Sequence, residues 1–479
     1  MTLTALRAAS LRRLRSTQLY PTTPVAIPVL AMDLWTLTAL VVALTVLMWA
    51  ISEPAGGALN WYLGVVWCLY APLGAMGVAG VLLHRRGRPF QRSEYTGRTD
   101  MQVIFTVPSL CHPQTVNALR RVVLSIARHA PANLSSWRVD VVTEEDNATP
   151  SLISELVALP NVRVVVVPSA YRTPTGASFK TRANHYAMEQ RRRDGENTLS
   201  AYVYHLDDDT HVGRDTVASI AEFIETHHGR RYLAQGILAF PRELTTSTLA
   251  WYCDAIRPAD DATRFALFTG WMGRPLGGLH GEHLIIRADI EDEIGWDFRD
   301  TVIEDAYFAL EFAIRYPGRS TTLNSFSYGA SPSSVSELVK QRRRWCEGLL
   351  RLICKRSLPW RVKAPLAYSV ITWAMAPFQF IGLIMIIAVL SGASVAPPFD
   401  WLTPIWAFGL GSLMWQYSQG VKFNMAASAQ QGSTWWRAAL CVPGIYVFFV
   451  IETCGVVLGW IRFLGFGRQK TSEVIAKPL

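Results

Sequence analysis

Long uncharged apolar segments lie on both sides of a polar middle region in this chain of 479 residues. Residues 34–51 and 61–83 precede the polar region, and each is long enough to cross a bilayer core of about 30 Å. Residues 365–393, 401–421 and 438–461 follow it, the last with a single charge at Glu452. Core helices of a soluble protein are the alternative, but their apolar runs are usually shorter. The sequence therefore predicts an α-helical, multi-pass transmembrane region.

Basic residues flank the first pair of apolar segments: four arginines lie among residues 7–15, and the basic run 84–88 follows. Positively charged flanks usually stay in the cytoplasm. We therefore expect a cytoplasmic middle region and a location in the cell membrane, inner or plasma. Contact of these residues with anionic membrane lipids then accounts for the net charge of +9. No basic element with interleaved aromatic residues indicates a nucleic acid partner.

The C-terminal topology does not follow the same rule. Three spans after a cytoplasmic domain would place four basic residues outside: Arg462, Arg468, Lys470 and Lys477. Either one segment is re-entrant, with possible breaks at residues 376–377 or 442–444, or the tail is an exception, and both remain open. The seven cysteines form no CxxC pair, so reduced thiols are expected.

From residue 101 the pattern changes to strands that alternate with helices. We expect strands at residues 102–107, 137–143, 162–167 and 202–206, separated by helices at 114–129, 151–159 and within 176–191. Such alternation predicts an α/β domain with a largely parallel sheet and helices on both faces. In sheets of this kind, ligands bind beyond the carboxyl ends of the strands.

The fourth of these strands ends in Asp207, Asp208 and Asp209. Three adjacent carboxylates repel one another unless a cation or several hydrogen-bond donors lie among them. Alternate residues of an extended segment point the same way, so Asp207 and Asp209 can share one divalent ion. A solvated acidic turn is the alternative. Pro108 after the first strand and residues 144–146 after the second reach the same edge, which favours a nucleotide and metal pocket.

Two later stretches also carry polar groups. Residues 277–283 combine glycines with His280 and His283, which favours a pocket wall over a zinc site because no further ligands stand at zinc spacing. Residues 341–345 begin an amphipathic helix, which is typical of a membrane interface.

These motifs, in this order, resemble the inverting glycosyltransferase family 2, whose domain has the Rossmann-like GT-A fold. The resemblance covers roughly residues 101–348. It rests on Pro108, the acids at 144–146, the Lys-x-Arg-x-Asn stretch at 180–184, the Asp-x-Asp at 207–209, Ile303-Glu304-Asp305 and Gln341-Arg342-Arg343-Arg344-Trp345. The His-Leu-Asp sequence at 205–207 and the Gln-Arg-x-Arg-Trp motif at 341–345 most resemble those of the egghead-like β-1,4-mannosyltransferases, which act on a glycolipid.

The resemblance implies a role for each motif. Asp305 is the catalytic base, with a charge at a helix N-terminus as the alternative role for it and Glu304. Asp207 and Asp209 hold Mn²⁺ or Mg²⁺. A UDP- or GDP-linked sugar is bound by Pro108, Glu144, Asp146, Lys180, Arg182 and Asp207; Glu144 and Asp146 are alternatives for the base and ribose contact. The acceptor and diphosphate are contacted by Gly278, His280, Glu304, Gln341, Arg344 and Trp345.

The resulting division of the chain has five parts. They are a basic cytoplasmic segment (1–27), a transmembrane hairpin (28–84), the GT-A domain (85–340), an interfacial helix (341–364) and a C-terminal transmembrane region of about three spans (365–479). We predict a metal-dependent, inverting hexosyltransferase that moves a sugar from a nucleotide sugar to a lipid or glycan acceptor at the membrane, with a lipid-linked acceptor favoured. A processive polysaccharide synthase and a non-catalytic membrane scaffold are the alternatives.

Overall fold

The computed structural model describes residues 33–51, 68–111, 115–146, 150–299, 301–378, 391–392, 402–429 and 434–465. The basic segment 1–27 and the C-terminal lysines lie outside the described residues. Parts of the apolar segments predicted at 61–83, 365–393 and 401–421 lie outside them as well.

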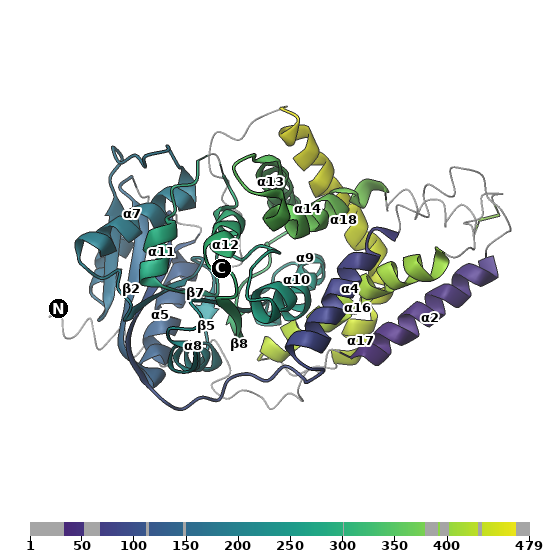
Figure 1. The fold of residues 1–479 in the computed structure, drawn as a ribbon, viewed down its shortest axis with the longest axis horizontal. Helices are drawn as coiled ribbons and strands as arrows, with labels where there is room; N and C mark the ends of the chain where they lie inside the picture. Colours follow the sequence, from purple (N-terminus) through teal and green to yellow (C-terminus); the bar gives the residue numbers. More distant parts are fainter. Residues whose placement is uncertain are drawn as a thin grey trace.

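An eight-stranded sheet forms the centre of the polar region (Figure 1). Its order is β3-β2-β1-β4-β7-β6-β8-β5. The strands are β1 (Thr99–Pro108), β2 (Leu134–Glu144), β3 (Val162–Val167), β4 (Ala201–His205), β5 (His211–Val212), β6 (Leu233–Ala239), β7 (Leu284–Arg287) and β8 (Ser320–Tyr328).

The predicted α/β class is confirmed, but the sheet is mixed rather than largely parallel. Strands β3, β2, β1 and β4 are parallel neighbours, as expected. Strand β7 then pairs antiparallel with both β4 and β6. The chain thus enters β7 at the sheet edge where β4 ends, and this reversal shapes the site.

Helices cover both faces of the sheet, because successive strand residues point to opposite sides. On one face Val103, Phe105 and Tyr204 pack against α5 (Val116–Asn133) and α8 (Arg214–His227). On the other face Val203 and Ile286 pack against α11 (Ala288–Ile294) and α12 (Glu304–Arg315). The remaining helices of this region are α6 (Pro150–Val157), α7 (Phe179–Arg193), α9 (Thr248–Asp254), α10 (Ile256–Asp260), the 3₁₀ turn η2 (Arg242–Leu244) and the π-helix η3 (Asp261–Trp271).

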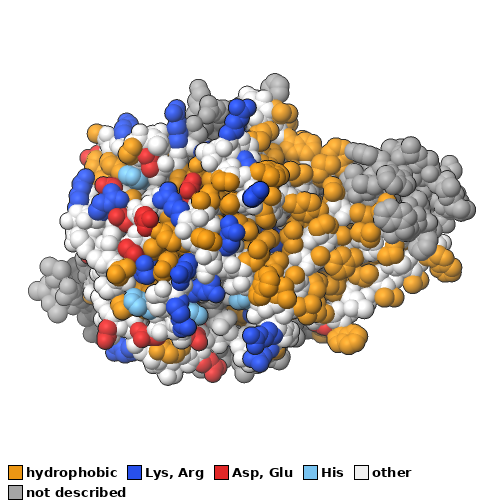
Figure 2. Space-filling view, viewed as in Figure 1, with side chains coloured by type: hydrophobic (Ala, Val, Ile, Leu, Met, Phe, Trp, Pro, Cys, Tyr) orange, Lys and Arg blue, Asp and Glu red, His pale blue; other side chains and the backbone are white. Residues whose placement is uncertain are grey.

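Apolar helices from both ends of the chain gather on one side of this domain (Figure 1). They are α2 (Leu34–Ile51), α4 (Ala71–Ala79) with its continuation η1 (Gly80–His84), α14 (Trp360–Ala374), α16 (Thr403–Ala427), α17 (Thr434–Ala439) and α18 (Cys441–Phe463). Hydrophobic side chains dominate this half of the visible surface, whereas charged side chains cover the other half (Figure 2). Among the described helices, only α18 is both long and apolar enough to cross a membrane; Leu34–Ala50 and Ala71–His84 are shorter apolar helices.

Helix α13 (Val335–Cys354) carries the Gln341 to Trp345 stretch and packs along α18. It begins at Val335, before the expected start at 341, because the Ser334 side chain caps it by accepting a hydrogen bond from the Glu337 amide at 3.2 Å. Two glycines of α18 allow the backbones of α18 and α13 to approach closely. A Cβ on Gly455 would lie 2.5 Å from the Arg342 Cβ, and one on Gly459 would lie 2.6 Å from the Cys346 Cβ.

Candidate active site

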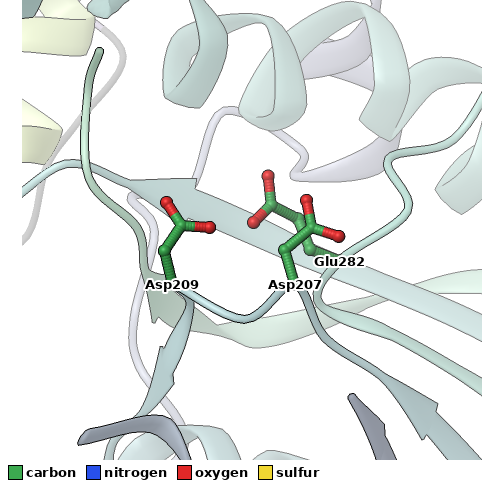
Figure 3. A group of neighbouring side chains, drawn as sticks. All are labelled: Asp207, Asp209 and Glu282. Atoms are coloured by element: carbon green, nitrogen blue, oxygen red, sulfur yellow. The ribbon is translucent and has the colours of Figure 1, made fainter. Parts of the chain in front are cut away.

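Three carboxylates meet at the sheet edge where β4 ends and β7 begins. His205, the last residue of β4, pairs with Leu284, the first residue of β7. The residues just outside these strands therefore lie side by side, so that Asp207 and Asp209 face Glu282 (Figure 3). One carboxylate oxygen of each lies within 4.8 Å of the others. Oxygen ligands of this kind suit a hard divalent cation, so the cluster fits the predicted metal site.

Glu282 is the member of this cluster that the sequence reasoning missed. Its two oxygens accept hydrogen bonds from the Thr210 hydroxyl and, at 3.2 Å, from the Arg257 guanidinium. Burial raises its pKa, and the nearby Asp207 and Asp209 raise it further. A cation among the three groups would relieve this repulsion. The feature of the sequence that could have indicated Glu282 is its position as an acid within the glycine-rich stretch at 277–283.

Asp208 points away from the cluster, as the alternation of an extended segment predicts. Its carboxylate accepts a hydrogen bond of 2.7 Å from the Ser109 hydroxyl. Burial and the adjacent Asp209 raise its pKa to about 7. Asp207 and Asp209 thus join the acidic cluster, whereas Asp208 lies in a separate buried environment beside Ser109.

Lys180, in the first turn of α7, lies between two groups of acids. Its ammonium donates to Asp207 and, at 2.9 Å, to the Gly281 carbonyl, and it lies 3.8 Å from Glu304. Burial lowers the pKa of Lys180, but the Asp207 and Glu304 carboxylates outweigh this, and the net shift is upward. The glycine leaves room for this contact, since a Cβ on Gly281 would lie 2.7 Å from the ammonium nitrogen.

Arg182, one half-turn further along α7, pairs with Glu144 at the end of β2. Its guanidinium also donates at 2.6 Å to the Pro168 carbonyl and lies 5.9 Å from the centre of the Tyr171 ring. Both basic residues predicted to contact a diphosphate are therefore held in place by carboxylates. Asp146, the alternative to Glu144, is exposed and does not line the cavity described below.

Glu304 and Asp305 form the first turn of α12. The Asp305 carboxylate accepts a hydrogen bond of 2.7 Å from the Ala306 amide. Burial raises the pKa of Glu304; Lys180 lowers it and Asp305 raises it, and the net shift is upward. Both acids line the cavity, in agreement with a chemical role, and both also sit where a helix dipole favours acids.

His280 and His283 have separate environments, which excludes a shared zinc ion. His280 lines the cavity, bonds the Asp261 carboxylate at 2.6 Å and stacks on Phe265 with ring centres 4.9 Å apart. Burial lowers the pKa of His280, but Asp261 raises it more. His283 is fully buried, and both of its ring nitrogens have partners, the Tyr204 hydroxyl and the Ser325 carbonyl.

Trp345 of α13 lies between two arginines. The guanidinium carbons of Arg257 and Arg342 lie 5.0 Å and 4.7 Å from the centre of its ring. Arg342 is itself buried and bonds Glu452 of α18 at 2.8 Å and Asp254 of α9 at 2.6 Å. The aromatic residue of the predicted acceptor site is thus connected, through arginines, to both Glu282 and α18.

One cavity of about 1040 Å³ joins these groups. With the exception of Asp146, every residue predicted for the site lines it: Pro108, Glu144, Lys180, Arg182, Asp207, Asp209, Gly278, His280, Glu304, Asp305, Gln341, Arg344 and Trp345. Gly278 has a φ of +98°, a conformation that favours glycine. Ligand pockets usually occupy about 300–1,000 Å³, so this cavity can hold two substrates side by side.

Comparison with known proteins supplies an independent assignment. A family described as glycosyl transferase family group 2 matches residues 202–419. β-1,4-Mannosyltransferase bre-3 of Caenorhabditis briggsae is 26% identical over 73% of this chain and 72% of its own length. β-1,4-Mannosyltransferase egh of Drosophila melanogaster is 29% identical over 46% and 47%.

A solved structure, mannosyltransferase PcManGT from Pyrobaculum calidifontis in complex with GDP-Man and Mn²⁺, aligns with a TM-score of 0.46 at 14% identity. The alignment covers 90% of this chain and 99% of that one.

The sequence relatives bear out the predicted resemblance to the egghead-like group. The family match begins at β4, so it includes the Asp-x-Asp motif, Glu282, Asp305 and the Gln341 to Trp345 stretch. The acids and cations that meet in the cavity therefore belong to a sugar-transferring enzyme: the chain is a hexosyltransferase that is similar, over residues 202–419, to glycosyl transferase family group 2.

Proposed function

We propose that this enzyme transfers mannose from a nucleotide sugar, with inversion, to a hydroxyl group of a lipid-linked acceptor at the membrane surface. The observation that carries the proposal is the single cavity in which the Asp207–Asp209–Glu282 cluster, Lys180 and Asp305 meet. The sugar is suggested by the names of the sequence relatives, which are mannosyltransferases.

The donor would occupy the end of the cavity formed by the β1, β2 and β4 strand ends in a GT-A arrangement. Pro108 and Glu144, which line the cavity, would contact the base and ribose, and Lys180 and Arg182 would offer positive charge to the diphosphate. Asp207, Asp209 and Glu282 would hold Mn²⁺ or Mg²⁺, which supplies charge neutralisation for the leaving diphosphate when bound.

Asp305 would accept the proton of the acceptor hydroxyl while that oxygen attacks the anomeric carbon. The Ala306 amide orients one carboxylate oxygen, which leaves the other for the acceptor. Glu304 has a raised pKa and lies 3.8 Å from the Lys180 nitrogen, so its part would be to position Lys180 and the acceptor.

The membrane assignment rests on the apolar helices. Helix α18 meets the length and composition of a span, and outward-facing side chains on several helices are exposed and hydrophobic, among them Trp35, Trp49, Ile371, Trp435, Val447 and Ile461. We propose a multi-pass protein whose catalytic domain is cytoplasmic, with α13 at the membrane interface.

The test is a transfer assay with full-length protein in lipid nanodiscs, with Mn²⁺ or Mg²⁺. Labelled GDP-mannose is compared with UDP-glucose, UDP-galactose and their N-acetyl forms, and label is followed into extractable lipid and into polymer. We expect discrete labelled lipid from GDP-mannose. Asp305→Asn should lower kcat about 10²- to 10⁴-fold, the usual contribution of a general base, with donor binding retained.

Asp292→Asn, which changes an acid on α11 outside the cavity, is the matched control and should retain activity. Label in high-mass polymer would replace this proposal with the polysaccharide synthase. No transfer from any donor, with Asp305→Asn indistinguishable from wild type, would favour the scaffold.

A further inference from the structure

The cavity extends well beyond the catalytic acids, into the bundle of apolar helices. Its far part, here called the apolar arm, is lined by side chains from four helices that are distant in sequence: Leu73 of α4, Leu366, Val370 and Trp373 of α14, Leu413 of α16, and Phe449 of α18. Because the same cavity contains Asp305 and Trp345, a ligand in the arm is continuous with the reaction centre.

The chemistry of the arm changes along its length. Its near end meets charged groups, including Arg257, Asp260 and Arg264, whereas its wall is formed by aliphatic and aromatic side chains. The carboxylate of Glu452 also reaches the lining, but both of its oxygens are bonded, one to Arg342 at 2.8 Å and the other to the Trp373 indole at 2.9 Å. The wall of the arm is thus mainly apolar, and the carboxylate that reaches it is already bonded.

The helices that form the arm also carry the hydrophobic outer surface. On α14, Val370 faces the cavity and is 3% exposed, while the adjacent Ile371 points outward and is 48% exposed. On α18, Phe449 lines the cavity and its neighbours Val447 and Val450 are exposed. The arm therefore lies inside the part of the molecule whose outer face suits lipid, separated from it by a single layer of helix.

We propose that the apolar arm binds the hydrocarbon chain of the lipid acceptor, so that its hydroxyl-bearing head lies beside Asp305 and Trp345. The inference rests on the proposed function and specifies where that acceptor is held. A hydrocarbon chain matches a wall that is mainly aliphatic and aromatic, whereas a growing polysaccharide would need hydrogen-bonding partners along its whole path.

The first experiment compares acceptors that differ only in chain length: methyl, octyl and hexadecyl β-glucosides, β-galactosides and β-mannosides, in nanodiscs with GDP-mannose and Mn²⁺. Val370→Trp fills the arm, and Ile371→Trp places the same side chain on the outer face of the same helix. The acceptor partitions into the bilayer equally in the assays of both variants. A difference between the two variants therefore measures binding of the acceptor chain in the apolar arm.

We expect kcat/KM of wild type and Ile371→Trp to rise by roughly tenfold or more from the methyl to the hexadecyl acceptor, since each buried methylene adds to binding. In Val370→Trp this rise should be lost, so that the methyl and hexadecyl acceptors react with similar kcat/KM, while the affinity for GDP, which binds at the sheet edge, is retained. Equal chain-length dependence in the two variants would overturn the proposal.

A second measurement does not depend on turnover or on the folding of a variant. A hexadecyl hexoside with a diazirine at the end of its chain is photolysed with the wild-type protein in nanodiscs, with and without excess unlabelled hexadecyl hexoside. Competable cross-links to Val370, Trp373, Leu413 or Phe449 would support the arm. Cross-links confined to outward residues such as Ile371 would overturn it. If all transfer and donor hydrolysis were absent, the proposed function would fail, and the cross-link map would still decide the lipid site.

Discussion

Lys180 is the residue on which the charges of the cavity converge. It donates to Asp207 of the acidic cluster and lies near Glu304, beside the proposed base. In the absence of substrate it offsets part of the repulsion among these acids. When a diphosphate binds, the same ammonium group is within the cavity to interact with it. The site is thus preorganised for an anionic donor by a cation that already has two partners.

The first residue-scale prediction concerns Glu282. Glu282→Gln keeps the shape and the Thr210 and Arg257 neighbours but removes one of the three charges available to a cation. We expect the Mn²⁺ concentration that gives half-maximal transfer to rise by roughly tenfold or more, comparable to the loss of a supporting group at a metal site. Titration calorimetry of Mn²⁺ with GDP present measures the affinity directly.

Asp208→Asn is the matched control for Glu282→Gln, because Asp208 binds Ser109 and does not join the cluster. Its Mn²⁺ affinity should stay within about twofold of wild type, less than 1 kcal/mol. An unchanged metal affinity in Glu282→Gln, or an equal loss in both variants, would remove Glu282 from the metal site.

Strand patterns alone could place four of the cavity residues at one sheet edge: Pro108, Glu144, Asp207 and Asp209. The roles of the other predicted cavity residues came from the resemblance to the family. Glu282 could not be placed at this edge, since its approach to Asp207 depends on β7 running antiparallel beside β4, a pairing that no local pattern records. For the acids after β2, the resemblance to the family left Glu144 and Asp146 as alternatives. The structure separates them, because Arg182 reaches only Glu144 among these two.

At the scale of elements, a buried ion pair ties α7 to α11 and β4. Glu291 of α11 bonds Arg191 of α7 at 2.6 Å and His205 of β4 at 2.8 Å, and its carboxylate also accepts from Trp296 at 2.7 Å. All of these side chains are essentially inaccessible to solvent. The cluster holds the C-terminal part of α7, and with it the register of the helix that begins with Lys180 and Arg182.

The second prediction follows from this cluster. Burial raises the pKa of Glu291, but Arg191 and His205 outweigh it and lower the pKa to about 2, from an ordinary 4.5. As the pH falls below 4.5, the Glu291 carboxylate is therefore protonated in the unfolded chain before it is protonated in the folded protein. The contribution of ionised Glu291 to the free energy of unfolding is complete above pH 4.5 and is lost as the pH falls towards 2.

Glu291→Gln leaves Arg191 buried without its charge partner and should cost about 3–5 kcal/mol at pH 7. The gap in thermal midpoint between wild type and variant should be smaller at pH 3.5 than at pH 7, as measured by scanning fluorimetry in detergent. Glu189→Gln removes a half-buried acid of α7 that pairs with the exposed Arg192, and it should lower the thermal midpoint much less than Glu291→Gln. A gap independent of pH would contradict the assigned charge state.

The contact between α13 and α18 carries the third prediction. Gly459→Leu would press a side chain into Cys346, the residue after Trp345, at a cost of about 1–3 kcal/mol for overpacking. Displacement of α13 should raise KM for the acceptor several-fold with little change in KM for the donor, whose contacts come from the sheet edge. Val457→Leu, at a partly exposed position of the same helix, is the control. Equal effects on both substrates would mean that α18 only supports overall folding.

Elements were predicted where a pattern was strong and local. Strand β3 matches the expected residues 162–167, whereas β6 and β8 were not predicted because Gln235, Gly236 and the serines and threonines of β8 interrupt the apolar pattern. These strands are stabilised by their neighbours rather than by their own composition, as edge and mixed-sheet strands often are.

For the whole molecule, two cysteines allow a test of the proposed membrane topology, which is the fourth prediction. Cys354 at the end of α13 and Cys454 within α18 are both exposed free thiols. In sealed inside-out vesicles, a membrane-impermeant maleimide should modify Cys354 and leave Cys454 unmodified, because lipid covers the latter. In denaturant both should react. Labelling of Cys454 in intact vesicles would show that α18 does not span the bilayer, and protection of Cys354 on this side would reverse the proposed orientation.

The glycine contacts between α18 and α13 have a further consequence for the molecule in its bilayer. Helix α18 has 23 residues, about 35 Å of helix, which is longer than a typical hydrocarbon core of about 30 Å. A helix with this mismatch adjusts by tilting, and the tilt depends on the thickness of the bilayer. Since Gly455 and Gly459 lock α18 against the helix that carries Gln341, Arg344 and Trp345, a change in tilt moves those side chains with it. For the proposed membrane enzyme, we therefore expect the rate of sugar transfer to vary with the acyl-chain length of the lipids that surround it.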